Sequence, residues 1–143
     1  MASVYSQDQL ETYLQRINYP NTTKPNQTRL QHLQHALQAN TLAAVTDLQQ
    51  RHLGSIPWGN SAIHYSQHHS ISTHPSAVFE KLVIRRLDGY CMENTNLLYG
   101  VLRSLGLQVY PAAGRVSSAA MNPKNAADVR YGSLYANDEY GAC

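Results

Sequence analysis

The chain has 143 residues, two cysteines and a formal net charge of +2, so it can bury one hydrophobic core but carries no disulfide framework. Its basic residues are scattered, its apolar runs are too short to cross a bilayer, and its first residues do not resemble a secretion signal, which argues against nucleic-acid and membrane partners. We therefore expect a cytoplasmic protein in a reducing compartment.

Three amphipathic helices are predicted in the first third of the chain. Ser-x-x-Gln and Thr-x-x-Gln capping boxes at Ser6 and Thr28 open the first two, and the first should cover residues 7–18. A third helix is predicted over residues 41–52, ending at Gly54. The apolar residues at helical spacing, expected to face the core, are Leu10, Tyr13, Leu14, Ile17, Leu30, Leu33, Leu37, Leu42, Val45 and Leu48.

The middle of the chain is predicted to be less regular. Residues 56–58 begin an extended passage, residues 63–65 predict a short strand, and residues 68–72 predict a polar loop. A helix with Pro75 in its first turn should follow. Its expected buried residues are Val78, Phe79, Leu82 and Val83.

Cys91 follows a turn made by Asp88 and Gly89, and a helical pattern then runs from Met92 to a glycine stop at Gly106. The free N–H groups at a helix N-terminus favour the thiolate form of a cysteine, which is its nucleophilic form. We therefore predict that Cys91 lies in the first turn of a helix. The residues expected on one buried stripe of that helix are Thr95, Leu98, Leu102 and Leu105.

The end of the chain changes in character. Residues 107–116 alternate weakly and predict the first strand of a following β-domain. Residues 117–143 have few branched apolar side chains and no period, which predicts a disordered tail. The predicted organisation is a helical domain over residues 1–106 that carries Cys91, followed by the start of a β-domain over residues 107–143.

Two motifs resemble the arylamine N-acetyltransferase family. Residues 89–94, Gly-Tyr-Cys-Met-Glu-Asn, are similar to the family's active-cysteine segment, Arg-Gly-Gly-x-Cys-x-Glu-x-Asn. Residues 56–60, Ile-Pro-Trp-Gly-Asn, are similar to its Ile-Pro-Phe-Glu-Asn stretch, and with their surroundings the two motifs cover residues 13–116. Considered alone, Cys91 is better explained as a small buried hydrophobe. The resemblance instead identifies it with the nucleophile position.

The resemblance implies a mainly α structure: the N-terminal helical domain of a papain-like acetyltransferase fold with a Cys-His-Asp triad. It also implies that the Cys91 thiolate takes the acetyl group of acetyl-coenzyme A and passes it to an arylamine or arylhydroxylamine nitrogen, without a metal. In the family an imidazole oriented by a carboxylate ionises the thiol, and that histidine follows the cysteine. Here the last histidine is His74. The triad His and Asp are therefore not found, and we expect a divergent or truncated chain that is catalytically incomplete.

Four histidines upstream of Cys91 offer an alternative base or a metal site. They are His64, His68, His69 and His74. No carboxylate or second cysteine accompanies them at the spacing of a zinc site, and nothing in the sequence places one beside Cys91, so a solvated loop explains them better. The downstream acids Asp128, Asp138 and Glu139 have no following or nearby histidine to orient.

Several positions depart from the family motifs. Leu87 stands where the family has Arg, Asp88 where it has the first Gly, Gly59 where it has Glu, and Thr95 where it has Asn, with Asn96 one step further. If the family's Arg and Glu form a buried ion pair, losing both is milder than stranding one charge, which costs about 3–5 kcal/mol. Restoring Arg at Leu87 alone should then destabilise the chain, and restoring Glu at Gly59 as well should not.

Two other classes of function compete with the transferase. The first is a non-catalytic interaction module or pseudo-enzyme fragment, in which exposed apolar surface on the helix over residues 98–105 favours self-association. The second is an unrelated thiol enzyme, which requires a base that the sequence does not provide.

Overall fold

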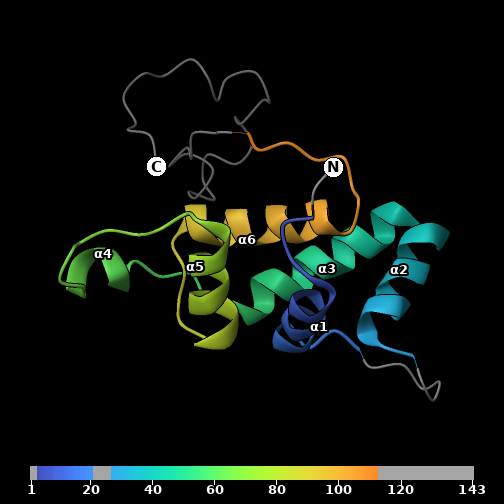
Figure 1. The fold of residues 1–143 in the computed structure, drawn as a ribbon, viewed down its shortest axis with the longest axis horizontal. Coiled ribbons are helices and arrows are strands. Elements are labelled where there is room, and N and C mark those ends of the chain that lie inside the picture. The colour runs from blue at the N-terminus through green and yellow to red at the C-terminus, as the bar shows by residue number, and fades with distance from the viewer. Residues whose placement is uncertain (1–2, 21–26, 113–143) are drawn as a thin grey trace, which may run out of the picture. The chain divides into compact units, whose positions relative to one another are not determined.

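The structure, a computed structural model, describes residues 3–20 and 27–112, and this part of the chain is helical apart from its turns (Figure 1). Its elements are α1 (Gln7–Arg16), α2 (Arg29–Ala39), α3 (Thr41–Ser55), α4 (Ser61–Tyr65), α5 (Pro75–Phe79), the π-helical turn η1 (Glu80–Ile84) and α6 (Cys91–Ser104). The predicted mainly α structure is therefore confirmed for the described residues, where no strand is found. None of the described helices is long and apolar enough to cross a bilayer.

The first two helices begin at the predicted capping boxes. The Ser6 hydroxyl accepts the Gln9 N–H at 3.2 Å, and the Gln9 side-chain oxygen accepts the Ser6 N–H at 2.9 Å. Thr28 starts α2 by the same reciprocal pair of bonds. Farther along the chain, α6 ends just before Gly106, whose φ of +85° supplies the left-handed residue of the predicted glycine stop.

The core lies where α1 packs against α2 and η1, and where α5 packs against α6. In Figure 1, α4 lies at one end, beyond α5, and contributes no buried residue. The fully buried apolar side chains are Tyr13, Leu14, Ile17, Leu33, Leu48, Leu82, Leu97, Val78 and Val101. Most of the residues expected in α1, α2 and the helix after Pro75 are among the buried ones, so those amphipathic faces are confirmed.

The predicted inner face of α3 was partly wrong. Leu42 is 78% exposed, whereas Ala44, Leu48 and His52 are buried. These three residues are spaced by four, so they form one side of the helix. Apolar periodicity did not predict this buried side, because one of its three residues is the polar His52. The helix also continues through Gly54 to Ser55, one residue past the expected stop.

The predicted inner face of α6 was shifted in the same way. The buried residues are Glu93, Leu97, Gly100 and Val101, while Thr95 is exposed. The expected residues Leu98, Leu102 and Leu105 are only half-buried and pack at the edge of the core. A carboxylate and a glycine occupy the true buried face, which therefore has a weak apolar signal.

Two predicted strands can be compared with the structure. Residues 63–65 belong to the helical turn α4, so that strand was wrong. Residues 107–112 form no strand. The rest of that predicted strand, and the predicted disordered tail over residues 117–143, lie outside the described residues.

Candidate active site around Cys91

The two motifs that resemble one family lie side by side in the structure. The Gly59 N–H donates to the Gly89 carbonyl at 3.0 Å, and the Gly89 N–H donates to the Pro57 carbonyl at 3.0 Å. These bonds make an isolated parallel bridge between Trp58 and Gly89. The Trp58 and Tyr90 rings lie beside it, with their centroids 6.0 Å apart. The bridge thus joins the segment before α4 to the turn that leads into Cys91.

Cys91 is the first residue of α6 and is half-buried with a free thiol. Its predicted place in the first turn of a helix is confirmed. Tyr90 precedes it in an extended conformation (φ −68°, ψ 163°) as the N-cap residue. The sulfur is therefore attached at the end of the helix where backbone N–H groups have no partner within the helix.

A buried ion pair stands next to this turn. Glu93 is 2% exposed, and each of its carboxylate oxygens lies 2.8 Å from the Lys81 ammonium. Its Oε2 atom also accepts the Tyr90 N–H at 2.9 Å. Sequence analysis missed both partners of this pair. Glu93 could have been found, because a glutamate three residues after an N-cap is the usual second member of a capping box; no local signal indicates Lys81.

The π-helical turn positions Lys81. The Arg85 N–H donates to the Glu80 carbonyl at 2.9 Å, which is the wider hydrogen-bonded turn of η1. The Leu87 N–H donates to the Lys81 carbonyl at 3.0 Å. Single π turns occur often at functional sites. Here the turn brings both the main chain and the side chain of Lys81 to the segment that carries Cys91.

Asn94 and Gly89 fix the other side of the turn. The Asn94 side-chain amide donates to the Gly89 carbonyl at 2.8 Å. A Cβ atom at Gly89 would lie 2.8 Å from a methyl carbon of Leu82 and 3.0 Å from the Asn94 amide nitrogen. A side chain here would force the buried Leu82 side chain to shift, so the glycine in the motif has a steric cause.

Asp88 fills the space of a side chain at Gly59. A Cβ atom at Gly59 would overlap the Asp88 carboxylate and lie 2.6 Å from its Cγ. The carboxylate accepts the Ser61 hydroxyl at 2.6 Å, and this hydrogen bond lowers the pKa of Asp88. The Ser61 N–H also points to it at 3.4 Å. Asp88 thereby holds the start of α4, which explains why the residues predicted as a strand are helical.

Replacing Gly59 by alanine is expected to destabilise the chain by about 1–3 kcal/mol, because the new methyl group forces the Asp88 side chain out of place. In an Asp88→Gly background the space is free, so there Gly59→Ala should cost much less than it does in the parent chain. Gly54→Ala is the matched control: nothing lies within 4 Å of a Cβ there, so it should be neutral or stabilising. Urea unfolding measures these variants, and an equal cost of Gly59→Ala in the parent and in the Asp88→Gly background would contradict the argument.

The same geometry bears on the hypothesis of a lost Arg–Glu pair. A glutamate side chain placed at position 59 would overlap the Asp88 side chain, whichever residue occupies position 87. Testing that hypothesis, which stays a prediction, therefore requires the replacement of Asp88 together with the two restored residues.

The four histidines considered as a substitute base are all exposed. His69 pairs with the Ile63 carbonyl and His74 with the Ser76 hydroxyl, each at 2.8 Å. In residues 3–20 and 27–112, none of the four rings is hydrogen-bonded to Cys91. Nor do three or more His, Cys, Asp or Glu side chains gather in this part of the chain as they do around a metal. The acids Asp128, Asp138 and Glu139 lie outside the described residues.

Sequence analysis also missed His52, the buried histidine of α3. It is 2% exposed, and its Nδ1 lies 3.0 Å from the Tyr13 hydroxyl. Burial, and secondarily the charge of Arg16, lower the pKa of His52 to about 4, against an opposing interaction with the Asn94 backbone. This ring is a neutral part of the core between α1 and α6.

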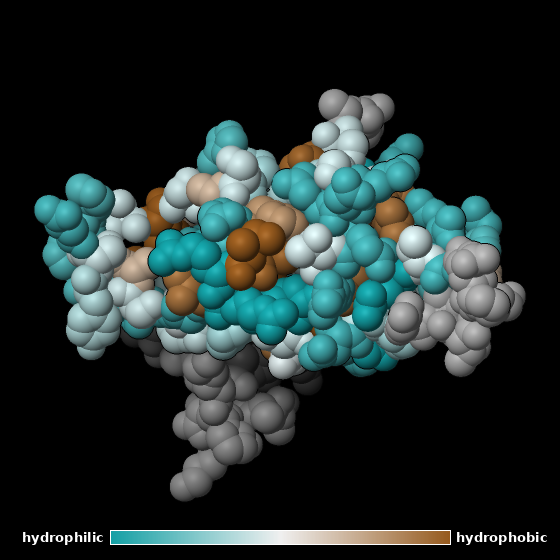
Figure 2. All heavy atoms as spheres, turned by 60° about the horizontal axis from the view of Figure 1, so that its bottom comes forward, coloured by the Kyte–Doolittle hydropathy of each residue, from teal (hydrophilic) through white to brown (hydrophobic). Residues whose placement is uncertain are grey.

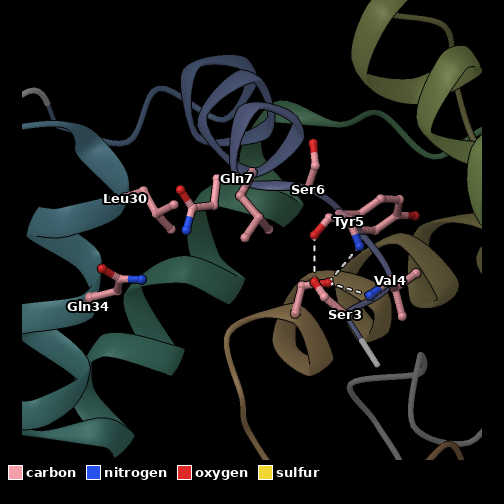
Figure 3. A pocket seen from close by; sticks show the side chains of 9 residues that line it. Ser3, Val4, Tyr5, Ser6, Gln7, Leu30 and Gln34 are labelled. Atoms are coloured by element: carbon pink, nitrogen blue, oxygen red, sulfur yellow. Dashed lines mark hydrogen bonds between the residues drawn. The ribbon is translucent and has the colours of Figure 1, made fainter. Parts of the chain in front are cut away.

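Two cavities of about 510 Å³ lie on the described unit. One borders the Cys91 turn, and its lining includes Ser61, Tyr65, Lys81, Arg85, Asp88 and Glu93. The other, drawn in Figure 3, lies between the N-terminal segment, α1 and α2. Its Ser104 hydroxyl already accepts the Val4 and Tyr5 N–H groups at 3.0 and 2.8 Å. The first cavity is therefore the one that borders the turn leading into α6, although Cys91 is not among its lining residues.

Comparison with known proteins agrees with this geometry. A family profile described as N-acetyltransferase matches residues 41–130. The N-malonyltransferase FDB2 of Fusarium pseudograminearum (strain CS3096) is 39% identical over 139 residues, which cover 94% of this chain and 38% of that protein. Arylamine N-acetyltransferase 1 of Felis catus is 33% identical over 81 residues, 57% of this chain and 31% of its own length. Arylamine N-acetyltransferase 1 of Homo sapiens is 28% identical over 109 residues, 76% and 32% of the respective lengths. The chain thus spans well under half of these relatives.

Proposed function

Because the chain belongs to the arylamine N-acetyltransferase family, we propose that it forms the nucleophile-bearing part of an acyl-coenzyme A:arylamine N-acyltransferase, with Cys91 as the nucleophile. The observation that carries the proposal is the backbone bridge between Trp58 and Gly89. It joins two distant family motifs directly in front of the helix that begins at Cys91. Chance similarity in one motif alone does not explain this pairing.

The proposed reaction has two steps. The Cys91 thiolate attacks the carbonyl carbon of acetyl-coenzyme A, a thioester forms on Cys91, and coenzyme A leaves as a thiolate that takes up a proton. An arylamine nitrogen then attacks the thioester, loses its proton and leaves as the N-acetyl product, which returns the cysteine to its thiol form. Proton transfer in both steps needs a base near the sulfur.

That base is the part of the triad that the sequence does not supply after Cys91. We propose that the 143-residue chain by itself is catalytically incomplete. Its helical domain over residues 1–106 would correspond to the first part of a papain-like fold, and residues 107–143 to the start of a β-domain. A cytoplasmic location and small arylamine substrates belong to the same proposal.

The test uses the purified chain, acetyl-coenzyme A and an aromatic amine, with release of coenzyme A thiol as the measurement. We expect no turnover above that of a Cys91→Ser control. A chimaera in which the chain replaces the matching segment of N-malonyltransferase FDB2 should turn over, and should stop when Cys91 is changed to Ser. Turnover by the unaided chain contradicts the incompleteness, and a folded but inactive chimaera contradicts the role of Cys91.

Malonyl-coenzyme A is a second candidate donor. The relative that matches 94% of this chain is named an N-malonyltransferase, which favours a donor with a carboxylate on the acyl group. Intact-mass analysis of the chimaera after incubation with each donor separates the two cases, since the acetyl and malonyl thioesters on Cys91 differ in mass. The Cys91→Ser variant is the control for labelling elsewhere.

A non-catalytic interaction module is the competing function, and one observation favours it. Leu42 is 78% exposed and Leu53 is 68% exposed, and eleven residues are about three helical turns, so both lie on one side of α3. Figure 2 shows a face on which apolar groups are small and separated by hydrophilic ones. This alternative predicts a concentration-dependent dimer by size exclusion that is lost in Leu42→Gln with Leu53→Gln, whereas the transferase proposal requires no such dimer.

A further inference from the structure

We propose that Lys81 is a positioning residue for Cys91: its ammonium group neutralises the buried Glu93 carboxylate that holds the turn in front of the sulfur. The inference rests on the proposed nucleophile role of Cys91. It assigns a function to a lysine that lies ten residues before the cysteine and outside both family motifs.

The first argument is geometric. Lys81 binds both ends of the turn, since its carbonyl accepts the Leu87 N–H at 3.0 Å and its ammonium binds the Glu93 carboxylate at 2.8 Å. Glu93 in turn accepts the N–H of Tyr90, the residue before Cys91, at 2.9 Å. Hydrogen bonds between charged partners are stronger and shorter than neutral ones. The backbone that directs the sulfur is therefore held from the π-helical turn through one carboxylate.

The second argument concerns charge. Cys91 and Glu93 share the first turn of α6, so an uncompensated carboxylate there opposes the negative thiolate. Solvent screens this carboxylate little, because Glu93 is 2% exposed and the Lys81 side chain 18% exposed. The other charged groups lining the adjacent cavity are Arg85, which makes no ion pair among the described residues, and Asp88, which is hydrogen-bonded to Ser61. Lys81 is thus the cation that cancels the charge of Glu93 beside the nucleophile.

A role in stability alone accounts less well for this pair. Buried ion pairs seldom stabilise a protein more than apolar residues of the same volume. The pair stands at the edge of the core: Leu82, next to Lys81 in the chain, is fully buried, while Lys81 and Glu93 both line the cavity that Arg85 and Asp88 also border. The charged pair is explained if the Glu93 carboxylate is needed to hold the Tyr90 N–H and the Lys81 ammonium is needed to neutralise its charge.

The experiment measures alkylation of Cys91 by iodoacetamide as a function of pH in the full chain carrying Cys143→Ser, so that one thiol remains. Lys81→Met should move the pH of half-maximal rate upward by about one unit and slow alkylation at pH 7 up to about tenfold. Glu93→Gln, which keeps an oxygen for the Tyr90 N–H, should move that pH downward. Lys81→Arg should restore the parent profile, and Glu80→Gln, an exposed neighbour, should leave it unchanged.

Shifts of opposite sign in Lys81→Met and Glu93→Gln support the inference, because a purely structural role changes the unfolding of both variants without moving the profiles apart. An unchanged profile in Glu93→Gln overturns it even if Lys81→Met does not fold. Alkylation needs no acyl donor. If the transferase assay fails but the two variants shift in opposite directions, only the proposed transferase function is rejected. If the assay succeeds but the profiles do not shift, only the positioning role of Lys81 is rejected.

Discussion

Replacing Lys81 by methionine is expected to lower the free energy of unfolding by about 3–5 kcal/mol, which is the usual cost of breaking one side of a buried ion pair. Among the described residues, the variant leaves the Glu93 carboxylate, 2% exposed, with the Tyr90 N–H alone as a hydrogen-bond partner. Methionine fills nearly the same volume, so the loss reports the charge more than the packing. Urea unfolding followed by circular dichroism measures it.

Two variants complete this test. Lys81→Arg keeps the cation and should lose much less stability than Lys81→Met. The double variant Lys81→Met with Glu93→Met removes both charges and should recover most of the loss, because no buried charge is left without a partner. A double variant as unstable as Lys81→Met alone would show that shape, and not charge, explains the effect.

Lowering the pH from 7 to 4 is expected to remove about 3 kcal/mol of stability through His52 alone. Burial lowers the pKa of this ring to about 4 from the usual 6.5. Below pH 6.5 the unfolded chain binds a proton that the folded chain does not bind. This contribution to stability is therefore complete above about pH 6.5, falls as the pH drops, and changes no further below about pH 4.

The control for this prediction is His52→Gln, which carries no titrating group at that position. Its free energy of unfolding should be lower at pH 7, since the fit to Tyr13 is disturbed, but its slope against pH between 4 and 6.5 should be smaller than that of the parent chain. The measurement is urea unfolding at half-unit steps of pH. An identical slope in parent and variant contradicts a neutral buried His52.

Local signals were sufficient to predict several features of the fold. The capping residues Ser6 and Thr28 act within four residues of themselves, and so does the glycine stop at Gly106. The place of Cys91 in the first turn of α6 followed from the short turn before it. The assignment of Cys91 as the nucleophile, which stays a prediction, came from the resemblance, supported by its place at a helix N-terminus.

Features that depend on distant partners could not be predicted. The start of α4 depends on Asp88, which lies 27 residues after Ser61 in the chain. The buried faces of α3 and α6 contain His52 and Glu93, which are polar and are buried because Tyr13 and Lys81 reach them from other elements. Hydrophobic periodicity takes no account of such pairs.

The backbone bridge between Trp58 and Gly89 has a consequence for which substitutions the site tolerates. Both of its hydrogen bonds connect main-chain atoms: the N–H groups of residues 59 and 89 donate, and the carbonyls of residues 89 and 57 accept. Among substitutions, only a proline at 59 or 89 removes a donor. Substitutions at neighbouring positions such as Leu87 and Asp88 therefore leave the donors and acceptors of this bridge in place.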